Sequence, residues 1–292
     1  MCKFFNINKY FFIAFIFIFS FILIFQNCKS PKHEVISDQS NEEITEESLD
    51  STHITLLSKL DQLIKKFPLP TEIITSLFNT RSLYNPEDLN KVSNISRYTT
   101  SYSKAFNIGI YATDLIYNIR YEQPQSALTY LDVTKKLSDE IGVTNVFNEK
   151  ILRRFEENID EKDSLMFLSY MAFSDLKKML RSNEQIELSL MVVSGIWFEG
   201  LHLSTSNFTE SKIDDITNEL IANIYKHKTQ VELIIDILKD VKSEDTYLNK
   251  LYNDLKNIDI FMNNLQTSDT ITKEEIAKLS LIVKDLRLKY IL

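Results

Sequence analysis

From residue 53 onward, apolar residues recur at spacings of three and four along most of the chain. This period places them on one face of an α-helix. It predicts helices over about 54–67, 71–78, 96–121, 124–141, 145–157, 161–181 and 185–205, with further helices after residue 209. The pattern therefore predicts an all-α fold, a multi-helix bundle or array of about nine to ten helices.

Start and stop signals agree with this period. Pro68 ends the first segment, Pro124 lies near the start of another, and Gly142 lies just past the end of that one. Proline suits the first turn of a helix, and glycine suits the position after its end. Thr272 and Glu275 have the spacing of a capping box, which predicts the start of the last helix.

The last third of the chain has a narrower apolar stripe than the rest. Its apolar residues alternate spacings of three and four through Leu248, Leu251, Leu255, Ile258, Met262 and Leu265, and again through Ile276, Leu279, Val283, Leu286 and Tyr290. This heptad-like pattern is typical of long helices packed side by side. We expect residues 209–292 to form a C-terminal helical bundle, or a layer of the same domain as residues 53–208.

Two predicted helices are apolar on nearly every face, over residues 103–121 and 186–203. A helix of this kind lies at the centre of a protein. Gly109 lies in the middle of the first one, where glycine costs about 1 kcal/mol relative to alanine. That position favours a close crossing with another helix. We expect both segments to be central helices of the 53–208 domain.

The N-terminus combines basic residues with an apolar run. Lys3 and Lys9 precede a 15-residue run from Phe11 to Phe25 that one serine interrupts. As a helix, this run would be about 22 Å long at 1.5 Å per residue, whereas the apolar core of a bilayer is about 30 Å thick. The run is short for a membrane-spanning anchor and fits a signal peptide over residues 1–27.

The stretch "FILIFQNCKS", residues 21–30, resembles the signal of bacterial lipoproteins. The resemblance implies cleavage before Cys28 and lipidation of its thiol. It also implies a place in the cell envelope, as an outer-membrane lipoprotein facing the periplasm or exposed at the surface. Asn27 and Phe25 depart from the usual small residue and leucine. The alternative is an uncleaved anchor helix in which Cys28 is unmodified.

The cysteine count agrees with lipidation. The chain has two cysteines, and Cys2 lies within the predicted signal. Cys28 would then be the first residue and the only thiol of the mature protein. An intramolecular disulfide and a cysteine metal site are both excluded in that form.

Residues 28–52 follow as a polar segment with few apolar residues and no helical period. Two lysines stand against seven acids: Glu34, Asp38, Glu42, Glu43, Glu46, Glu47 and Asp50. Such a segment buries too little apolar surface to offset its ordering entropy. We expect a disordered acidic linker that holds the helical body away from the membrane.

The charge balance excludes nucleic acid as a partner. The chain carries a net charge of −8 and has no run of lysine and arginine. Binding to phosphates needs a basic face. With only four glycines, a phosphate-cradling loop is also excluded, and we expect no cofactor.

Glu199 and His202 form a Glu-x-x-His pair on the second apolar segment. That spacing occurs in the di-metal sites of four-helix bundles, which need two such pairs. No other histidine of this chain has a glutamate three residues before it, so we expect no metal. Asp114, on the first apolar segment, is the third candidate because a buried aspartate needs a partner. Either these residues form structural contacts, with Glu199 hydrogen-bonded to His202, or they serve a metal, a small ligand or an enzyme reaction.

Large aromatic residues of the same segments are candidates for a ligand groove. Tyr111 and Tyr117 lie on the first segment, and Trp197, the only tryptophan of the chain, lies on the second. Such side chains combine an apolar body with a polar tip, which suits a groove and also the edge of a core. The sequence leaves both interpretations open.

The body of the chain also resembles uncharacterised helical lipoproteins of Gram-negative bacteria. The resemblance lies in "NIGIYATDLIY" (107–117) and "YLDVTKKLSDEIG" (130–142), and it implies an envelope location and an all-α fold. We expect a membrane-tethered binding module for another envelope protein or a small ligand, rather than an enzyme. An enzyme would bring Asp114, Glu199, His202 and a tyrosine around one solvent-reachable cavity.

Overall fold

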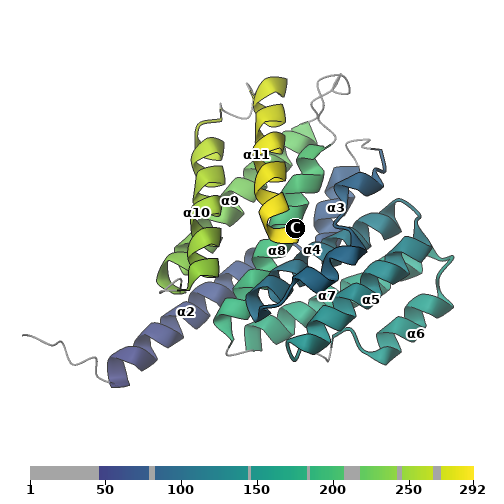
Figure 1. Cartoon of the computed structure of the whole chain (residues 1–292), viewed down its shortest axis with the longest axis horizontal. Coiled ribbons are helices and arrows are strands. Elements are labelled where there is room, and N and C mark those ends of the chain that lie inside the picture. Colours follow the sequence, from purple (N-terminus) through teal and green to yellow (C-terminus); the bar gives the residue numbers. More distant parts are fainter. Residues whose placement is uncertain are drawn as a thin grey trace, which may run out of the picture. The chain divides into compact units, whose positions relative to one another are not determined.

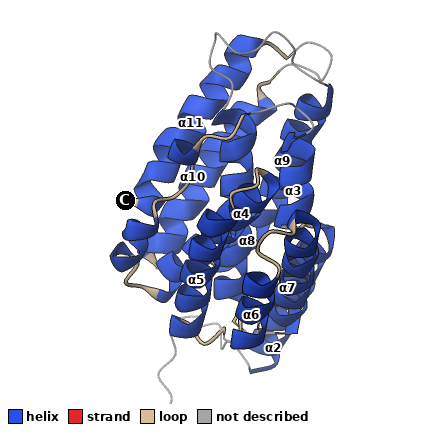
Figure 2. Ribbon diagram, turned by 90° about the vertical axis from the view of Figure 1, so that its right-hand side faces the viewer, coloured by secondary structure: helices blue, strands red, loops and turns tan. Residues whose placement is uncertain are grey.

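Ten α-helices and two 3-10 helices make up the described part of the protein, in a computed structural model of the chain. The structure describes residues 46–78, 83–143, 146–182, 185–206, 218–241, 245–265 and 271–292. Within these residues there is no strand, and Figure 2 shows helices joined by loops. The prediction of an all-α array of about ten helices is confirmed. The predicted signal peptide, Cys28 and the linker up to residue 45 lie outside the described residues.

The helices follow one another in the order shown in Figure 1. They are α2 (Glu46–Lys66), α3 (Pro70–Phe78), η1 (Pro86–Asp88), η2 (Val92–Arg97), α4 (Ser101–Arg120), α5 (Pro124–Glu140), α6 (Glu149–Glu157), α7 (Lys162–Ser182), α8 (Ile186–Ser206), α9 (Asn218–Val241), α10 (Thr246–Asn263) and α11 (Lys273–Ile291).

The helices α4 and α8 form the centre of the protein, as their all-round apolar sequences predict. Every residue of α4 from Ala105 to Ile119 is buried. The two helices approach closely at glycines. A Cβ on Gly109 would overlap the Val192 carbonyl oxygen and lie 2.6 Å from the Ile196 nitrogen, and a Cβ on Gly195 would overlap the Phe106 carbonyl oxygen. Only glycine permits this crossing.

Six of the described helices pack against this central pair, while α6 packs on α5 and α7, and α10 packs on α9 and α11 (Figure 1). The helices α3, α5, α7 and α11 contact α4, while α2, α3, α7, α9 and α11 contact α8. Each of these outer helices contributes buried apolar side chains to the core. The residues 45–292 form one compact unit, so a helix of the last third, α11, reaches the same central core as the helices before it.

The stripe predicted in the last third is buried. Its members in α10 and α11 lie in the core, from Leu248 to Met262 and from Ile276 to Tyr290. The helices α10 and α11 pack against each other, and α9 packs against α10 and α8. The capping box at the start of α11 is present, because the Thr272 hydroxyl accepts from the Glu275 N–H while the Glu275 carboxylate accepts from the Thr272 N–H.

Three helix starts differ from the sequence prediction, and one of them is that of α6, which begins at Glu149 rather than at residue 145. The helix α2 begins at Glu46 rather than near residue 54, so the last residues of the expected 28–52 linker are helical. The helix α4 begins at Ser101 rather than 96, because Thr100 caps it and a 3-10 helix precedes it.

By length and composition, α8 is the described helix that is able to cross a membrane. It has 21 residues and contains an 18-residue window with a mean hydropathy of 1.3, but 89% of that window is buried inside the protein. Its apolar character therefore belongs to a core helix, because the central helix of a globular protein must be apolar on all faces.

Candidate functional site

Glu199 of α8 and Arg287 of α11 form a buried ion pair. Arg287 Nε donates to Glu199 Oε2 at 2.5 Å, and Arg287 Nη2 donates to Glu199 Oε1 at 2.5 Å. The two side chains are 0% and 5% exposed for Glu199 and Arg287. A bidentate pair of this kind is among the strongest hydrogen-bonded arrangements of charged groups. Burial alone lowers the pKa of Arg287, but the charges of Glu199 and Asp114 outweigh it and raise the pKa.

Asp114 of α4 lies beside this pair. Its Oδ2 accepts from the Asn90 backbone N–H at 3.0 Å, and it lies close enough to Glu199 and Arg287 for their charges to affect its pKa. Burial, followed by the charge of Glu199, raises the pKa of Asp114 well above its ordinary value, against the opposing effect of Arg287. The structure thus brings together Asp114 and Glu199, two acids that the sequence singles out. They lie around Arg287, which the sequence does not single out.

His202 is near this cluster but has another partner. Its Nε2 lies 3.0 Å from the Asp88 carbonyl oxygen, so Nε2–H donates, and its Nδ1 has no hydrogen-bond partner among the described residues. Burial, followed by the charge of Arg287, lowers the pKa of His202 well below its ordinary value. The expected hydrogen bond between Glu199 and His202 is absent from the described contacts, because the guanidinium of Arg287 takes both oxygens of Glu199.

Asn90 links this cluster to the surrounding polar side chains. Its backbone N–H binds Asp114, its carbonyl accepts from Tyr130 at 2.9 Å, and its side-chain nitrogen donates to Tyr98 at 2.9 Å and to Asn107 at 3.1 Å. Its side-chain oxygen accepts from Asn94 at 3.0 Å. A buried polar residue satisfied at each atom fixes the loop before α4 to the core.

Arg287 and Asn90 are not among the residues that the sequence patterns single out. Arg287 is four residues after Val283 and three before Tyr290, so it lies on the apolar face of α11. A basic residue on the apolar face of a helix predicts a buried acidic partner. Asn90 lies in a short loop between two 3-10 helices, and no local pattern distinguishes it.

The three aromatic candidates are core residues whose polar tips bind the main chain. Tyr111 donates to the Lys91 carbonyl at 2.9 Å, and Trp197 Nε1 donates to the His227 carbonyl at 2.9 Å. The Tyr117 hydroxyl accepts from the Asn85 N–H at 3.1 Å. None of them lines the cavities described below. The core interpretation therefore fits them better than the groove interpretation.

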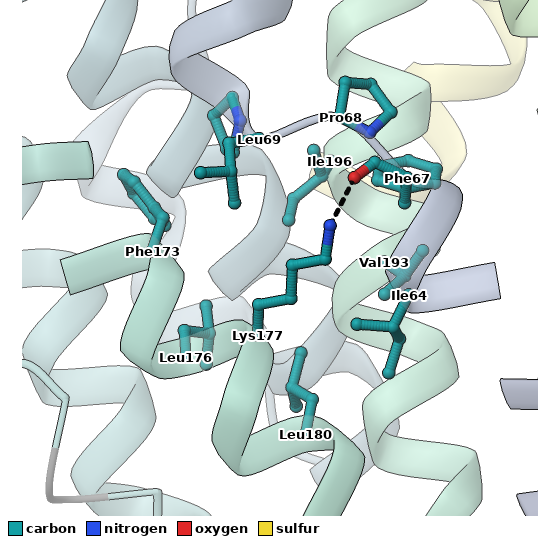
Figure 3. A pocket seen from close by; sticks show the side chains of 11 residues that line it. Ile64, Phe67, Pro68, Leu69, Phe173, Leu176, Lys177, Leu180, Val193 and Ile196 are labelled. Carbon is teal, nitrogen blue, oxygen red and sulfur yellow. Dashed lines mark hydrogen bonds between the residues drawn. The ribbon is translucent and has the colours of Figure 1, made fainter. Parts of the chain in front are cut away.

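An apolar cavity of about 30 Å³ lies between α2, α7 and α8. Figure 3 shows Lys177 extended beside it, with its ammonium group on the Phe67 carbonyl oxygen at 2.8 Å. The apolar lining includes Phe173, Val193 and Ile196. A cavity of this volume holds a water molecule or two. It does not touch Asp114, Glu199 or His202.

Two further hollows lie elsewhere. One of about 70 Å³ lies between α3 and α9 and includes His227 and Gln230, and burial followed by the charge of Lys226 lowers the pKa of His227 to about 3. Another of about 360 Å³ lies beside the Glu122–Lys162 ion pair. Asp114 and Glu199 line neither of them. Among the described residues, no group of three or more His, Cys, Asp or Glu side chains is arranged to hold a metal ion.

Comparisons of this chain with protein-family models, with curated proteins and with solved structures find no match. Its function is therefore argued from its own residues. Asp114, Glu199 and Arg287 are all buried, and Glu199 and Arg287 pair with each other. In this arrangement they can join α4, α8 and α11 across the centre of the protein.

Proposed function

We propose that this protein is a membrane-tethered envelope lipoprotein whose helical body binds another protein through an apolar face of α7. The observation that carries the proposal is a set of exposed apolar side chains on one side of that helix. Phe167 is 58% exposed, Tyr170 is 46% exposed and Met171 is 39% exposed. Spacings of three and four place them on one face of α7. We refer to these three residues as the α7 face.

The composition of the α7 face fits a protein partner. Single exposed apolar residues are ordinary, but three large ones within one helical turn form a patch. Tyrosine, phenylalanine and methionine are enriched at the centres of protein interfaces. Asp163 and Asp175 lie at exposed positions on the same helix. Lys178 pairs with Asp175 at 2.9 Å, so charges of both signs flank the α7 face, and the choice of a protein partner rests on the composition of the face itself.

The proposed tether rests on the sequence alone. The signal-like N-terminus places a cysteine directly after an apolar run, and lipid chains on Cys28 would hold the body at a membrane. This arrangement confines the α7 face to partners in the same compartment. We place that compartment in the envelope, at the outer membrane and facing the periplasm or the surface.

The rival interpretation is a metal-binding protein, a small-ligand-binding protein or an enzyme that uses Asp114, Glu199 and His202. It requires those side chains to face a cavity that a substrate can enter. In the described part of the chain, Glu199 is saturated by Arg287, and the cavities lie elsewhere. The closed geometry of the cluster therefore supports the binding module over this rival.

Site-specific photo-crosslinking in intact cells tests the proposal. A photoreactive phenylalanine analogue replaces Tyr170 in the full chain, and in a matched protein it replaces Leu281, which is 62% exposed on α11. We expect a discrete adduct of defined mass from position 170 and none from position 281. Adding Phe167→Ser and Met171→Ser to the protein with the analogue at position 170 should abolish the adduct.

The control variants separate the parts of the proposal. In a Cys28→Ala background the adduct at position 170 should be lost or strongly reduced, because the body would leave the membrane surface. An adduct formed equally from both positions, or from neither, would contradict a specific partner at the α7 face. An adduct that contains only a second copy of this chain would replace the partner with self-association.

A further inference from the structure

The centre of the protein contains two carboxyl groups and one guanidinium group close together. Both oxygens of Glu199 lie 2.5 Å from Arg287 nitrogens, and Asp114 lies near enough to both side chains for their charges to act on one another. Both acids are 0% exposed. If both were ionised, two negative charges would share one positive charge out of reach of water. An uncompensated buried charge is strongly destabilising.

The hydrogen bonds show which atom lacks a partner. Asp114 Oδ2 accepts from the Asn90 N–H, whereas Asp114 Oδ1 is buried with no donor among the described residues. Two ionised carboxylates can only accept hydrogen bonds, so contact between them is a hydrogen bond only if one carries a proton. A proton on Oδ1 would turn this orphan atom into the donor of that bond.

We infer that Asp114 is a neutral carboxylic acid at neutral pH and donates its proton to Glu199, which stays ionised and paired with Arg287. The proton belongs to Asp114 because Glu199 accepts two charge-assisted bonds, which favour its ionised form. Asp114 accepts only a neutral backbone N–H. The cluster is then electrically balanced, with one anion and one cation.

The surroundings of Asp114 agree with this assignment. Burial and the charge of Glu199 raise the pKa of Asp114, and these effects exceed that of Arg287. Four tyrosines, which are neutral at this pH, also interact with Asp114: Tyr84, Tyr98, Tyr111 and Tyr130. Asp88 and His202 interact with Arg287 instead, and His202 is neutral because its pKa is lowered. No second cation among these groups stabilises an ionised Asp114.

The inference has a consequence for the pH dependence of the fold. In the unfolded chain the carboxyl has its ordinary pKa of 3.8, whereas the folded value is higher. The folded state therefore retains a proton that the unfolded state has lost. This contribution to stability is complete below pH 3.8 and is lost as pH rises toward the folded value. A hydrogen bond through this proton would join α4 to α8, and rising pH would weaken it.

Infrared spectroscopy of the full chain labelled with ¹³C-carboxyl aspartate tests the inference directly. We expect a protonated-carboxyl C=O band from labelled aspartate at neutral pH in the wild type. Asp114→Asn should remove the band, whereas the control Asp163→Asn, at an exposed position on α7, should leave it. Absence of the band from the wild type, or its survival in Asp114→Asn, would overturn the inference.

The stability of the same variants supplies an independent test. The amide introduced by Asp114→Asn provides a donor for Glu199 and an acceptor for the Asn90 N–H, so it mimics the protonated acid. Within the window above pH 3.8, the folded-to-unfolded ratio of the wild type should fall relative to this variant by up to about tenfold per pH unit. Parallel profiles for the two proteins would contradict the inference, as would failure of Asp114→Asn to fold.

Discussion

Arg287 contacts Glu199 through two hydrogen bonds in a part of the core that water does not reach. Its guanidinium is the counter-charge of that acid, so its removal leaves a buried carboxylate unpaired. Sequence analysis found the acid but not this partner. The difference is physical, because a charge is matched in space and its partner here lies 88 positions away in the chain.

The first prediction concerns this pair. Arg287→Met keeps most of the apolar stem of the side chain and removes the charge. We expect the free energy of unfolding to fall by about 3–5 kcal/mol, measured by urea denaturation, because breaking one side of a buried ion pair has that effect. Lys59→Met is the matched control, because Lys59 pairs with Asp236 and Asp240 at the surface. A surface pair contributes about 0–1 kcal/mol, and equal losses would contradict the prediction.

A second prediction concerns His227. Burial lowers its pKa from 6.5 to about 3 in the folded protein, so between these values the unfolded state binds a proton that the folded state does not. The resulting stability is complete above pH 6.5 and is lost as pH falls toward 3. In this acidic range the ratio of folded to unfolded protein should fall less steeply with falling pH in His227→Gln than in the wild type. The difference in slope should be up to about tenfold per pH unit.

Urea denaturation at a series of pH values measures this effect. The control is His53→Gln, because His53 is exposed. His202 is also buried with a lowered pKa, so part of the acid limb should remain in His227→Gln. An acid limb that is identical in the wild type and His227→Gln would show that His227 is protonated to the same degree in the folded and the unfolded chain.

At the scale of elements, the crossing of α4 and α8 determines how the core is built. Gly109 was predictable as a crossing point, because a glycine inside an all-apolar helix has little other reason to be there. Its counterpart Gly195 lies on α8 against Phe106, and only the packing shows that the two face the same contact. The helix starts were less predictable, because the acids at the start of α2 suit both a helix terminus and a solvated linker.

The third prediction tests this crossing. The methyl group of Gly109→Ala would overlap backbone atoms of Val192 and Ile196 in α8. Backbone atoms move less readily than a side chain. We expect a loss at or above the upper end of the usual range of about 1–3 kcal/mol for overpacking, measured by thermal or urea unfolding. The control is Gly200→Ala, whose Cβ would meet the side chains of Ile73 and His227 at 3.0 and 3.2 Å. A larger loss for Gly200→Ala would contradict the backbone contact as the cause.

At the scale of the whole molecule, the outer helices close the core, and the proposed tether determines where the body acts. The fourth prediction is that Cys28→Ala abolishes lipidation and moves the protein from the membrane fraction to the soluble fraction. Cell fractionation with metabolic labelling by a fatty-acid analogue measures both effects. A variant that stays in the membrane and keeps its N-terminal residues would show that the apolar run is an anchor helix.

Three features depend only on residues that are close together in the sequence. They are the helical period, the capping box at Thr272 and the two segments that are apolar on every face. The sequence by itself determined these features, because a helix forms its hydrogen bonds within one segment and its apolar faces follow from spacing. Only the tertiary structure decided that Asp114, Glu199 and Arg287 meet, and that His202 binds the main chain instead of Glu199. Many charged residues satisfy the same local pattern, and the packing of α4, α8 and α11 selects which of them are buried together.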